Sequence, residues 1–217
     1  ERRSAFSGKY SLWLEGTIRA IMETRRCDAD AARRIMEEFE SKGRTTRQFY
    51  GQMQEWLAPQ MLVDKSPAYV CDMRALEKAE RDFDGAIYLH LVRHPYAMVR
   101  SFERYHMEQV LFLKEHPFTP RQLGELIWTI SHQNTLEFLK TVPAGRQYRI
   151  RFEDMVYRPQ EIMEGMCTTL GLEYHPALVE PYQGIEKKMT DGLYKDSTPM
   201  GDTHLLEELR HGWDYVL

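Results

Sequence analysis

The chain has 217 residues, of which 42% are hydrophobic and 29% are charged, and its formal net charge is −4. These values are ordinary for a globular protein with one sizeable core. The acidic balance argues against a general nucleic-acid-binding protein, and no apolar stretch approaches the roughly 20 residues of a membrane-spanning helix. The first residues do not have the pattern of a signal peptide.

The chain contains three cysteines, which are far apart, and eight histidines, which are scattered along it. An odd number of well-separated cysteines is not a disulfide framework, and it is typical of proteins from a reducing compartment. Histidine and cysteine are nowhere grouped as they are in metal sites. We therefore expect a cytoplasmic protein with free cysteines and no bound metal.

The N-terminal part of the chain predicts three helices, because apolar residues recur in it at helical spacing. Asp28 and Asp30 are alternative N-caps of the second helix, and Gly43 ends it. Pro59 breaks the third helix, since proline disrupts a helix interior. The three helices are expected over residues 9–26, over 28–41, and from Thr45 or Thr46 through Trp56.

Farther along, short apolar runs alternate with helical patterns. The runs at 61–63, 87–92 and 148–152 are predicted strands. The predicted helices cover residues 72–82, 95–113, 120–141 and 159–171. Gly171 closes the last of them, and a polar tail follows Pro176. Strands that alternate with helices favour a parallel sheet covered by helices on both faces, here within a single domain over residues 1–217.

Polar residues follow each predicted strand. Ligands of parallel sheets bind at the carboxyl ends of the strands, so clusters in this position are candidate ligand-binding residues. The three clusters are Asp64-Lys65-Ser66, Arg93-His94 and Arg151-Glu153-Asp154. Their shared position at strand ends is stronger evidence for a binding site than any one cluster by itself.

The turn after the second predicted strand is the most informative part of the sequence. Arg93 ends the apolar run, Pro95 suits the first turn of a helix, and Ser101 lies about two turns farther on. The N–H groups of such a turn, together with an arginine that binds phosphate through two hydrogen bonds, form an anion site. An ordinary strand–helix turn with a surface arginine explains the spacing equally well.

Four segments, taken in order, resemble sulfotransferases that use 3′-phosphoadenosine-5′-phosphosulfate as donor. They are VDKSPAY at 63–69, LVRHP at 91–95 followed by Ser101, RFEDM at 151–155 and LGL at 170–172. A narrower likeness, to sulfotransferase domains of modular polyketide synthases of the olefin-synthase and curacin type, rests on LVDKSP at 62–67, VRHPY at 92–96 and the pair Gln133-Asn134. The resemblance implies an α/β fold of the P-loop type, a three-layer sandwich with a central parallel sheet.

The resemblance assigns nucleotide-binding roles to four residues. Arg93 and Ser101 match the clamp on the 3′-phosphate, and Lys65 matches a lysine that neutralises charge on the leaving phosphate. Ser66 is a further candidate for positioning the same groups. The plainer interpretations are a buried helix hydroxyl for Ser101 and a surface lysine for Lys65.

Catalysis also needs a base that takes the proton from the acceptor hydroxyl. His132 and His106 are the candidates within the chain, although a structural or substrate-lining role is the stronger interpretation of each. The family's first strand and its glycine-rich phosphosulfate-binding loop have no counterpart in this sequence, so we expect the domain to be N-terminally incomplete. In many relatives the base follows that loop, and it would then be absent as well.

The remaining matched residues have supporting roles. Glu153 and Asp154 are expected to cap the next helix or to pair with basic neighbours. His94 stands where sulfotransferases often have an aspartate, and it is either a donor to the phosphate or a structural histidine. Lys195 and Ser197 belong to a late segment that either closes over the nucleotide or is a solvated loop.

The resemblance thus implies an enzyme that transfers a sulfuryl group to an alcohol, releases 3′,5′-adenosine bisphosphate and needs no metal. The narrower likeness implies, as acceptor, the β-hydroxyl of an acyl chain on an acyl carrier protein, with neither nucleic acid nor membrane as a partner. Sulfation would create a good leaving group, and a neighbouring thioesterase domain would release the chain with decarboxylation and loss of sulfate, which leaves a terminal alkene.

Two alternatives stay open. One is a sulfotransferase for a carbohydrate or another free small-molecule alcohol. The other is a non-catalytic nucleotide-binding or interaction module that has kept the fold. A P-loop kinase ranks lower, because the sequence has no Gly-x-x-x-x-Gly-Lys-Ser/Thr segment.

Overall fold

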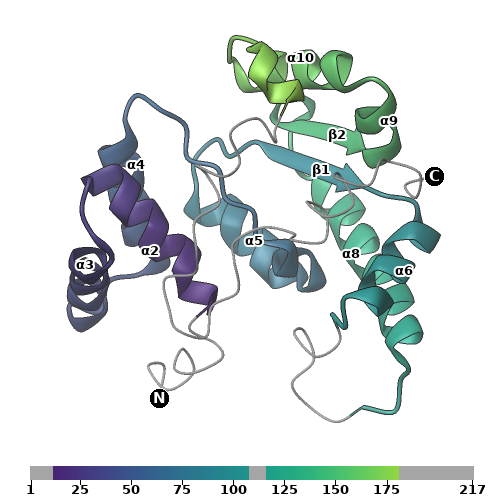
Figure 1. Ribbon diagram of the computed structural model, residues 1–217, viewed down its shortest axis with the longest axis horizontal. Coiled ribbons are helices and arrows are strands. Elements are labelled where there is room, and N and C mark those ends of the chain that lie inside the picture. The colour runs from purple at the N-terminus through teal and green to yellow at the C-terminus, as the bar shows by residue number, and fades with distance from the viewer. Residues whose placement is uncertain (1–11, 108–115, 181–217) are drawn as a thin grey trace. The chain divides into compact units, whose positions relative to one another are not determined.

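The computed structural model describes residues 12–107 and 116–180 of the chain. The backbone contacts group the chain into two compact units, one of residues 1–63 and 182–217 and the other of residues 64–181. Figure 1 labels the α-helices and the strands of both units. The single domain expected over residues 1–217 stays a prediction.

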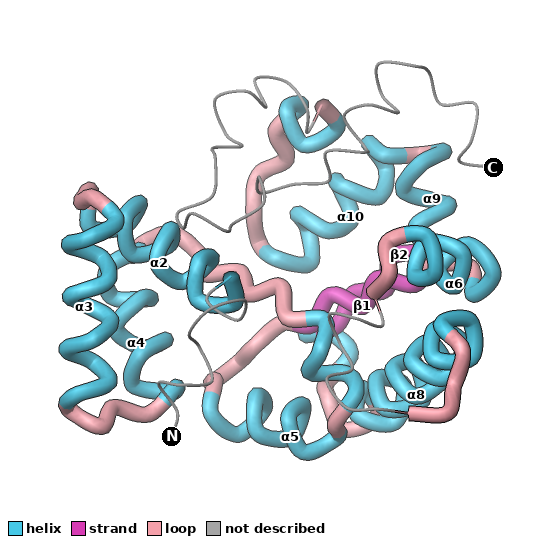
Figure 2. Tube along the Cα trace, turned by 60° about the horizontal axis from the view of Figure 1, so that its bottom comes forward, coloured by secondary structure: helices cyan, strands magenta, loops and turns pink. Residues whose placement is uncertain are grey.

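The described part of the first unit consists of three helices, α2 (Leu12–Arg25), α3 (Ala29–Ser41) and α4 (Thr46–Leu57), which Figure 2 shows. They confirm the three predicted helices. The side chain of Asp28 caps the start of α3, whereas Asp30 pairs with Arg33 inside the helix. Thr45 begins a capping box at the start of α4. The buried residues among these helices are Ile18, Ile21, Ala32 and Met53.

The apolar run at residues 61–63 is not a strand, so this prediction is wrong. Met61 and Val63 are 44% and 71% exposed. Within the described residues, the two strands β1 (Tyr88–Val92) and β2 (Gln147–Arg151) pair with each other, and no strand pairs with 61–63. Three apolar residues without a neighbouring strand have no partner for their backbone groups, and they form an irregular connection instead.

The second unit is built on β1 and β2, which run parallel with Tyr88 opposite Gln147. Helix α8 packs on the face that carries Tyr88, whose ring centroid lies 4.9 Å from that of Phe138. Helix α10 packs on the other face, where the hydroxyl of Tyr148 donates to the carbonyl of Ile162 at 3.3 Å. Helices on both faces of a parallel sheet confirm the predicted α/β class (Figure 1, Figure 2). The described helices of this unit are η2 (Pro67–Cys71), α5 (Met73–Asp82), α6 (Pro95–Arg104), α8 (Pro120–Leu139), η3 (Ala144–Arg146), α9 (Phe152–Tyr157), α10 (Pro159–Leu170) and η4 (Pro176–Val179).

Most predicted boundaries in this unit agree with the structure to within a few residues. Helix α6 begins at Pro95 as expected and ends at Arg104, and residues 108–113 of the predicted helix lie outside the described residues. Helix α9, directly after β2, is an addition to the predicted elements, because its six residues are too few to show a helical period. Gly171, in the left-handed conformation with φ of 67°, ends α10 as predicted.

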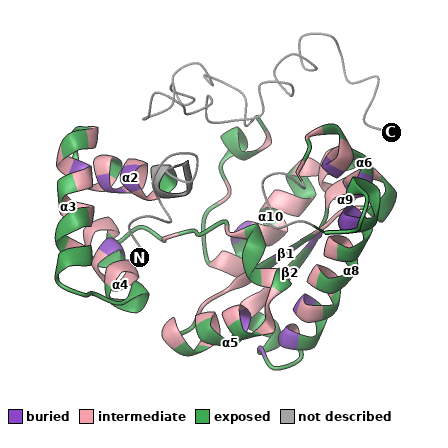
Figure 3. Ribbon diagram, turned by 90° about the horizontal axis from the view of Figure 1, so that it is seen from below, coloured by how far each residue is buried: buried purple, intermediate pink, exposed green. Residues whose placement is uncertain are grey.

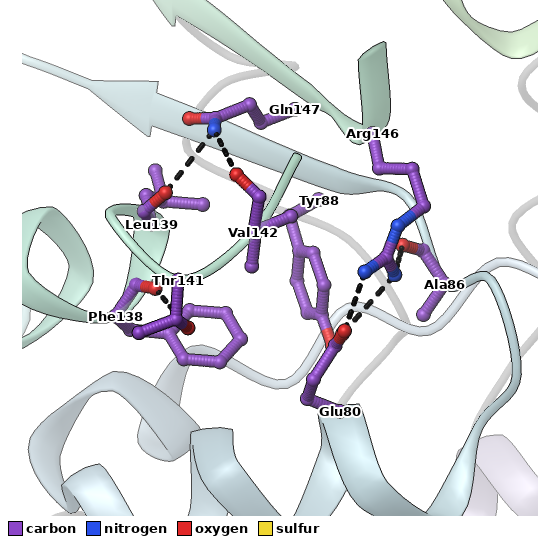
Figure 4. A network of polar contacts seen from close by, with 9 residues as sticks. All are labelled: Glu80, Ala86, Tyr88, Phe138, Leu139, Thr141, Val142, Arg146 and Gln147. Atoms are coloured by element: carbon purple, nitrogen blue, oxygen red, sulfur yellow. Dashed lines mark hydrogen bonds and ion pairs between the residues drawn. The ribbon is translucent and has the colours of Figure 1, made fainter. Parts of the chain in front are cut away.

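Polar contacts hold the beginnings of the two strands, as Figure 4 shows. Arg146 donates to the carboxylate of Glu80 and, at 2.9 Å, to the carbonyl of Ala86, while the hydroxyl of Tyr88 donates to Glu80 at 2.9 Å. The Arg146 guanidinium lowers the pKa of Glu80, so this carboxylate stays charged. The side-chain amide of Gln147 donates to the carbonyl of Leu139, the last residue of α8, and to that of Val142 in the loop after it. These contacts fix the amino ends of β1 and β2 and leave the carboxyl ends to form the opposite edge.

Helices α6 and α8 pack tightly against each other. Val99 and Phe102 of α6 are each 5% exposed, and Leu123 of α8 is 2% exposed. Gly124 allows a close approach, since a Cβ atom there would lie 3.4 Å from the Phe102 ring. Figure 3 shows that both helices combine buried and exposed positions. The middle and the end of α6 are therefore held in place by α8.

Candidate functional site

Arg93 lies at the carboxyl end of β1, just before α6. Its guanidinium carbon lies 4.6 Å from the centroid of the Phe152 ring, and its backbone carbonyl accepts the indole N–H of Trp128 at 3.0 Å. The side-chain Nε is buried and has no hydrogen-bond partner among the described residues. A buried donor without a partner is costly. Among the predicted site residues, Arg93 thus combines a fixed guanidinium with an unpaired donor, as an anion site requires.

The first turn of α6 is less open than the sequence suggests. The backbone N–H of His94 donates to Glu153 Oε1 at 2.8 Å, and the N–H of Tyr96 donates to His94 Nδ1 at 3.3 Å. Pro95 between them has no N–H. The expectation that the N–H groups of this turn are free for an anion is therefore wrong for these two groups, because the chain supplies their acceptors. His94 is consequently a structural N-cap, which was one of its two predicted roles.

The clusters after β1 and β2 lie together, as predicted. The contacts of His94 with Glu153 and of Arg93 with Phe152 join them. Asp154 pairs with Arg158 at 3.2 Å, which confirms its predicted pairing with a basic neighbour. Glu153 caps the turn after the adjacent strand and not its own helix. The bond from His94 lowers the pKa of Glu153, so its carboxylate is charged at neutral pH.

The short helix η2, which follows the cluster around Lys65, is held against α8. Lys65 is exposed, and the hydroxyl of Ser66 donates to Asp64 Oδ1 at 2.9 Å. A little farther on, the side-chain amide of Asn134 donates to the carbonyl of Val70 at 2.9 Å. Asn134 therefore anchors η2 to α8. Among the described residues, no hydrogen bond or ion pair joins Lys65 to the end of β1.

Ser101 lies in α6 on the turn that follows the buried residue Val99, and it is half-buried. Its hydroxyl has no hydrogen bond in the part of the chain that the structure describes, so it is available to a ligand. Lys195 and Ser197 lie outside the described residues, and their role stays a prediction.

The two histidines proposed as bases differ in their surroundings. His106 is exposed at the end of α6, where its φ of 49° places it in the left-handed region. His132 is half-buried on α8, and its Nδ1 lies 3.0 Å from Nε2 of His90 in β1. The ring of Trp128 lies 4.5 Å from that of His132 between centroids. His132 is thus fixed by two rings.

Both members of the histidine pair are neutral at neutral pH. Burial lowers the pKa of His90 to about 4, and the nearby His132 and Arg149 contribute to the shift. Burial lowers the pKa of His132 as well. A neutral imidazole has one N–H and one lone pair, so each ring donates at one nitrogen and accepts at the other.

Two residues of this region, His90 and Phe152, are not among the predicted site residues. His90 lies within the predicted strand at 87–92, and Phe152 ends the predicted strand at 148–152. A histidine in the middle of an apolar strand is a usable signal, because a buried polar group needs a partner. The position of Phe152 beneath Arg93 has no such signal in the sequence.

A cavity of about 450 Å³ between α6 and α8 is lined by Pro95, Tyr96, Val99, Arg100, Glu103, Arg121 and Glu125, and it includes none of the predicted nucleotide-binding residues. Among the described residues, no group of three or more His, Cys, Asp and Glu side chains is placed to hold a metal ion. No described helix is long and apolar enough to cross a membrane.

Comparison with known proteins points to one family. The sulfotransferase family matches the chain over residues 5–176. Among solved structures, the chain is similar to the sulfotransferase domain from the curacin biosynthetic pathway, with 37% identity, a TM-score of 0.79, and coverage of 89% of this chain and 67% of that one. It is also similar to the sulfotransferase domain from the Synechococcus PCC 7002 olefin synthase, with 29% identity, a TM-score of 0.76, and coverage of 95% and 67%. A search of curated proteins found no match.

These similarities agree with the order of the sequence segments and with the observed architecture. The family match extends from the first unit through the end of α10, and it includes the turn of Arg93 and the segment of Lys65. The chain therefore belongs to the sulfotransferase family.

Proposed function

We propose that the protein takes its sulfuryl group from 3′-phosphoadenosine-5′-phosphosulfate and that Arg93 binds the 3′-phosphate of this nucleotide. The observation that carries the proposal is the buried Nε of Arg93, which has no partner in the described chain while the guanidinium rests on the Phe152 ring. Ser101 is the second ligand, since its hydroxyl has no bond within the described residues and its helix starts beside Arg93. A phosphate group suits both, because it accepts several charge-assisted hydrogen bonds at once.

Lys65 is proposed to neutralise charge on the leaving phosphate, with Ser66 beside it. Its exposure supports this role, because the ammonium group is not engaged by a carboxylate among the described residues. In the reaction, the acceptor oxygen forms a bond to sulfur while the bond from sulfur to the bridging phosphate oxygen breaks. The acceptor proton passes to a base, and 3′,5′-adenosine bisphosphate is released. Lys195 and Ser197 are proposed to cover the nucleotide.

The proposed acceptor is the β-hydroxyl of an acyl chain carried by an acyl carrier protein. The likeness to the sulfotransferase domains of the curacin pathway and of an olefin synthase supports this choice. A neighbouring thioesterase domain would then release the sulfated chain as a terminal alkene. The alternative acceptor is a carbohydrate or another free alcohol. An enzyme for free alcohols should turn over a β-hydroxy acid equally well with and without the carrier protein.

Calorimetric titration of the whole protein that contains this sequence tests the donor site. The expected result is tight binding of 3′,5′-adenosine bisphosphate and weak binding of 5′-AMP, which lacks the 3′-phosphate. Arg93→Ala should lower the affinity for 3′,5′-adenosine bisphosphate by about 10- to 100-fold, the usual contribution of hydrogen bonds to a charged group. The affinity for 5′-AMP should stay unchanged.

Arg100→Ala is the matched control, because Arg100 lies on the same helix and faces the ring of Tyr96. It should leave both affinities unchanged. Equal binding of the two nucleotides by the unchanged protein would refute the proposed donor. Transfer assays with carrier-bound and free β-hydroxy acids then decide between the two acceptors.

A further inference from the structure

The hydrogen bond between His90 and His132 has only two possible arrangements. Nε2 of His90 and Nδ1 of His132 are 3.0 Å apart, and both rings are neutral. One of these two nitrogens must carry the proton of the bond and the other must accept it. If His132 donates, its other nitrogen, Nε2, carries a lone pair and is basic. If His90 donates, Nε2 of His132 carries a proton.

The second nitrogen of His90 decides between the two arrangements. Nδ1 of His90 is buried and has no hydrogen-bond partner among the described residues. If His132 donated, this atom would be an enclosed N–H without an acceptor. If His90 donates, it is an enclosed lone pair without a donor. Among buried backbone groups, an N–H without an acceptor is rarer than an acceptor without a donor. The same preference, applied to the imidazole ring, places the proton of His90 on Nε2.

We infer that His90 is a positioning residue: it donates from Nε2 to Nδ1 of His132 and thereby makes Nε2 of His132 a hydrogen-bond donor and not a base. Nε2 of His132 has no partner in the described part of the chain, and it is not among the atoms enclosed without one. It is therefore open to a ligand. The inferred tautomer does not depend on the proposed function. The role of His132 toward the acceptor or the sulfuryl group, by contrast, rests on the proposed function.

Other contacts keep this arrangement in place. Within the described parts of the chain, Arg149 lies opposite His90 in the strand register, and the neutral ring of Trp128 lies beside His132. Arg149 disfavours a charged His90, because its own positive charge helps to lower the pKa of that ring. Trp128 also donates to the carbonyl of Arg93, so the ring that contacts His132 is bonded to the residue proposed to hold the phosphate. A neutral donor at this place suits an oxygen that carries or gains negative charge during transfer.

Nitrogen NMR of the protein labelled with ¹⁵N-histidine tests the inference without any assay of activity. Long-range ¹H–¹⁵N correlation separates rings protonated at Nδ1, at Nε2 and at both nitrogens. The signals of the pair are assigned by their loss in His90→Gln and in His132→Gln. We expect both rings to carry their proton on Nε2 at about pH 7.5. A proton on Nδ1 of His132 would overturn the inference.

Two variants of His90 separate positioning from simple packing. His90→Gln retains an N–H donor and should preserve the Nε2–H form of His132, whereas His90→Phe fills the space without a donor and should give a mixture of tautomers. His175→Gln, which changes the cap of η4, is the control and should not move the signals of His132. If His90→Phe does not fold, the unchanged protein and His90→Gln still decide the question.

Transfer assays then examine the role of His132. A donor is partly replaced by an amide, so His132→Gln should lower kcat less than tenfold, while His132→Leu should lower it by about 10- to 100-fold. Losses above 100-fold in both variants would identify His132 as the base and contradict the inference. If the protein shows no transfer and no preference for the 3′-phosphate, the proposed function fails while the tautomer result stands by itself.

Discussion

The backbone N–H of His94 donates to the carboxylate of Glu153 across 2.8 Å, and this bond ties the turn after β1 to the helix after β2. The two residues are 59 positions apart in the chain. Through this contact and the stacking of Arg93 on Phe152, the carboxyl ends of both strands act as one support for the proposed phosphate site. The geometry of that site thus depends on residues that would not themselves touch the nucleotide.

Replacing Glu153 by alanine should destabilise the protein by about 1 kcal/mol, because the N–H of His94 loses a charged acceptor. The turn that carries Arg93 should loosen as well, and the affinity for 3′,5′-adenosine bisphosphate should fall severalfold. Urea unfolding and calorimetry measure the two effects. Glu161→Ala is the control, since Glu161 forms an exposed ion pair with Arg158. Unchanged stability and affinity in Glu153→Ala would show that the bond does not support the site.

The ring of Phe152 should contribute to phosphate recognition by holding the guanidinium of Arg93. Phe152→Leu keeps the apolar volume but removes the cation–π contact, so the preference for 3′,5′-adenosine bisphosphate over 5′-AMP should fall about two- to fivefold. Arg93→Lys should have a larger effect, because lysine lacks the planar fork that binds a phosphate through two bonds. Competition binding of the two nucleotides measures this preference in both variants. Tyr96→Leu removes the comparable ring beside Arg100 and should leave the preference unchanged.

Gly165 of α10 should tolerate no side chain. A Cβ atom there would lie 2.3 Å from the hydroxyl oxygen of Tyr148, so Gly165→Ala should destabilise the protein by about 1–3 kcal/mol. Adding Tyr148→Phe should restore part of this loss, because the hydroxyl is gone while a ring carbon stays at 3.2 Å. Gly51 in α4 has open space around it, and Gly51→Ala should instead stabilise by about 0.5–1 kcal/mol. Thermal unfolding of the three variants and of the double variant checks the signs.

Burial of His90 should make the fold sensitive to acid. Its pKa is about 4 in the folded chain, against 6.5 for a free histidine, so the unfolded chain takes up a proton first as the pH falls. The stability present above about pH 6.5 is therefore lost between about pH 6.5 and pH 4, and the loss amounts to about 2 kcal/mol by about pH 4.5.

Urea unfolding at about pH 7.5 and about pH 4.5 measures this loss in the unchanged protein and in His90→Gln, which does not titrate at this position. The variant should lose about 2 kcal/mol less than the unchanged protein between the two conditions. His175→Gln should keep the full loss, because His175 caps an exposed turn. An identical loss in all three proteins would show that His90 is not the group responsible.

Local patterns in the sequence were sufficient for most of the secondary structure. Asp28 caps α3, Pro95 opens α6 and Gly171 closes α10, each because its own chemistry restricts the backbone within one turn. The order of the segments around Lys65, Arg93 and RFEDM at 151–155 was likewise enough to identify the family. Where a local pattern was too short, as at 61–63, the prediction was wrong, because a strand also needs a neighbour.

The contacts that shape the site were decided by tertiary structure. His90 and His132 are 42 positions apart, and neither residue carries a local signal that predicts the other as its partner. The same holds for His94 with Glu153 and for Arg93 with Phe152. A helix cap or a turn depends on atoms within a few residues, which the sequence places directly. A hydrogen bond between a strand and a distant helix depends on how the sheet and its covering helices pack, and only the folded chain brings its two atoms within reach.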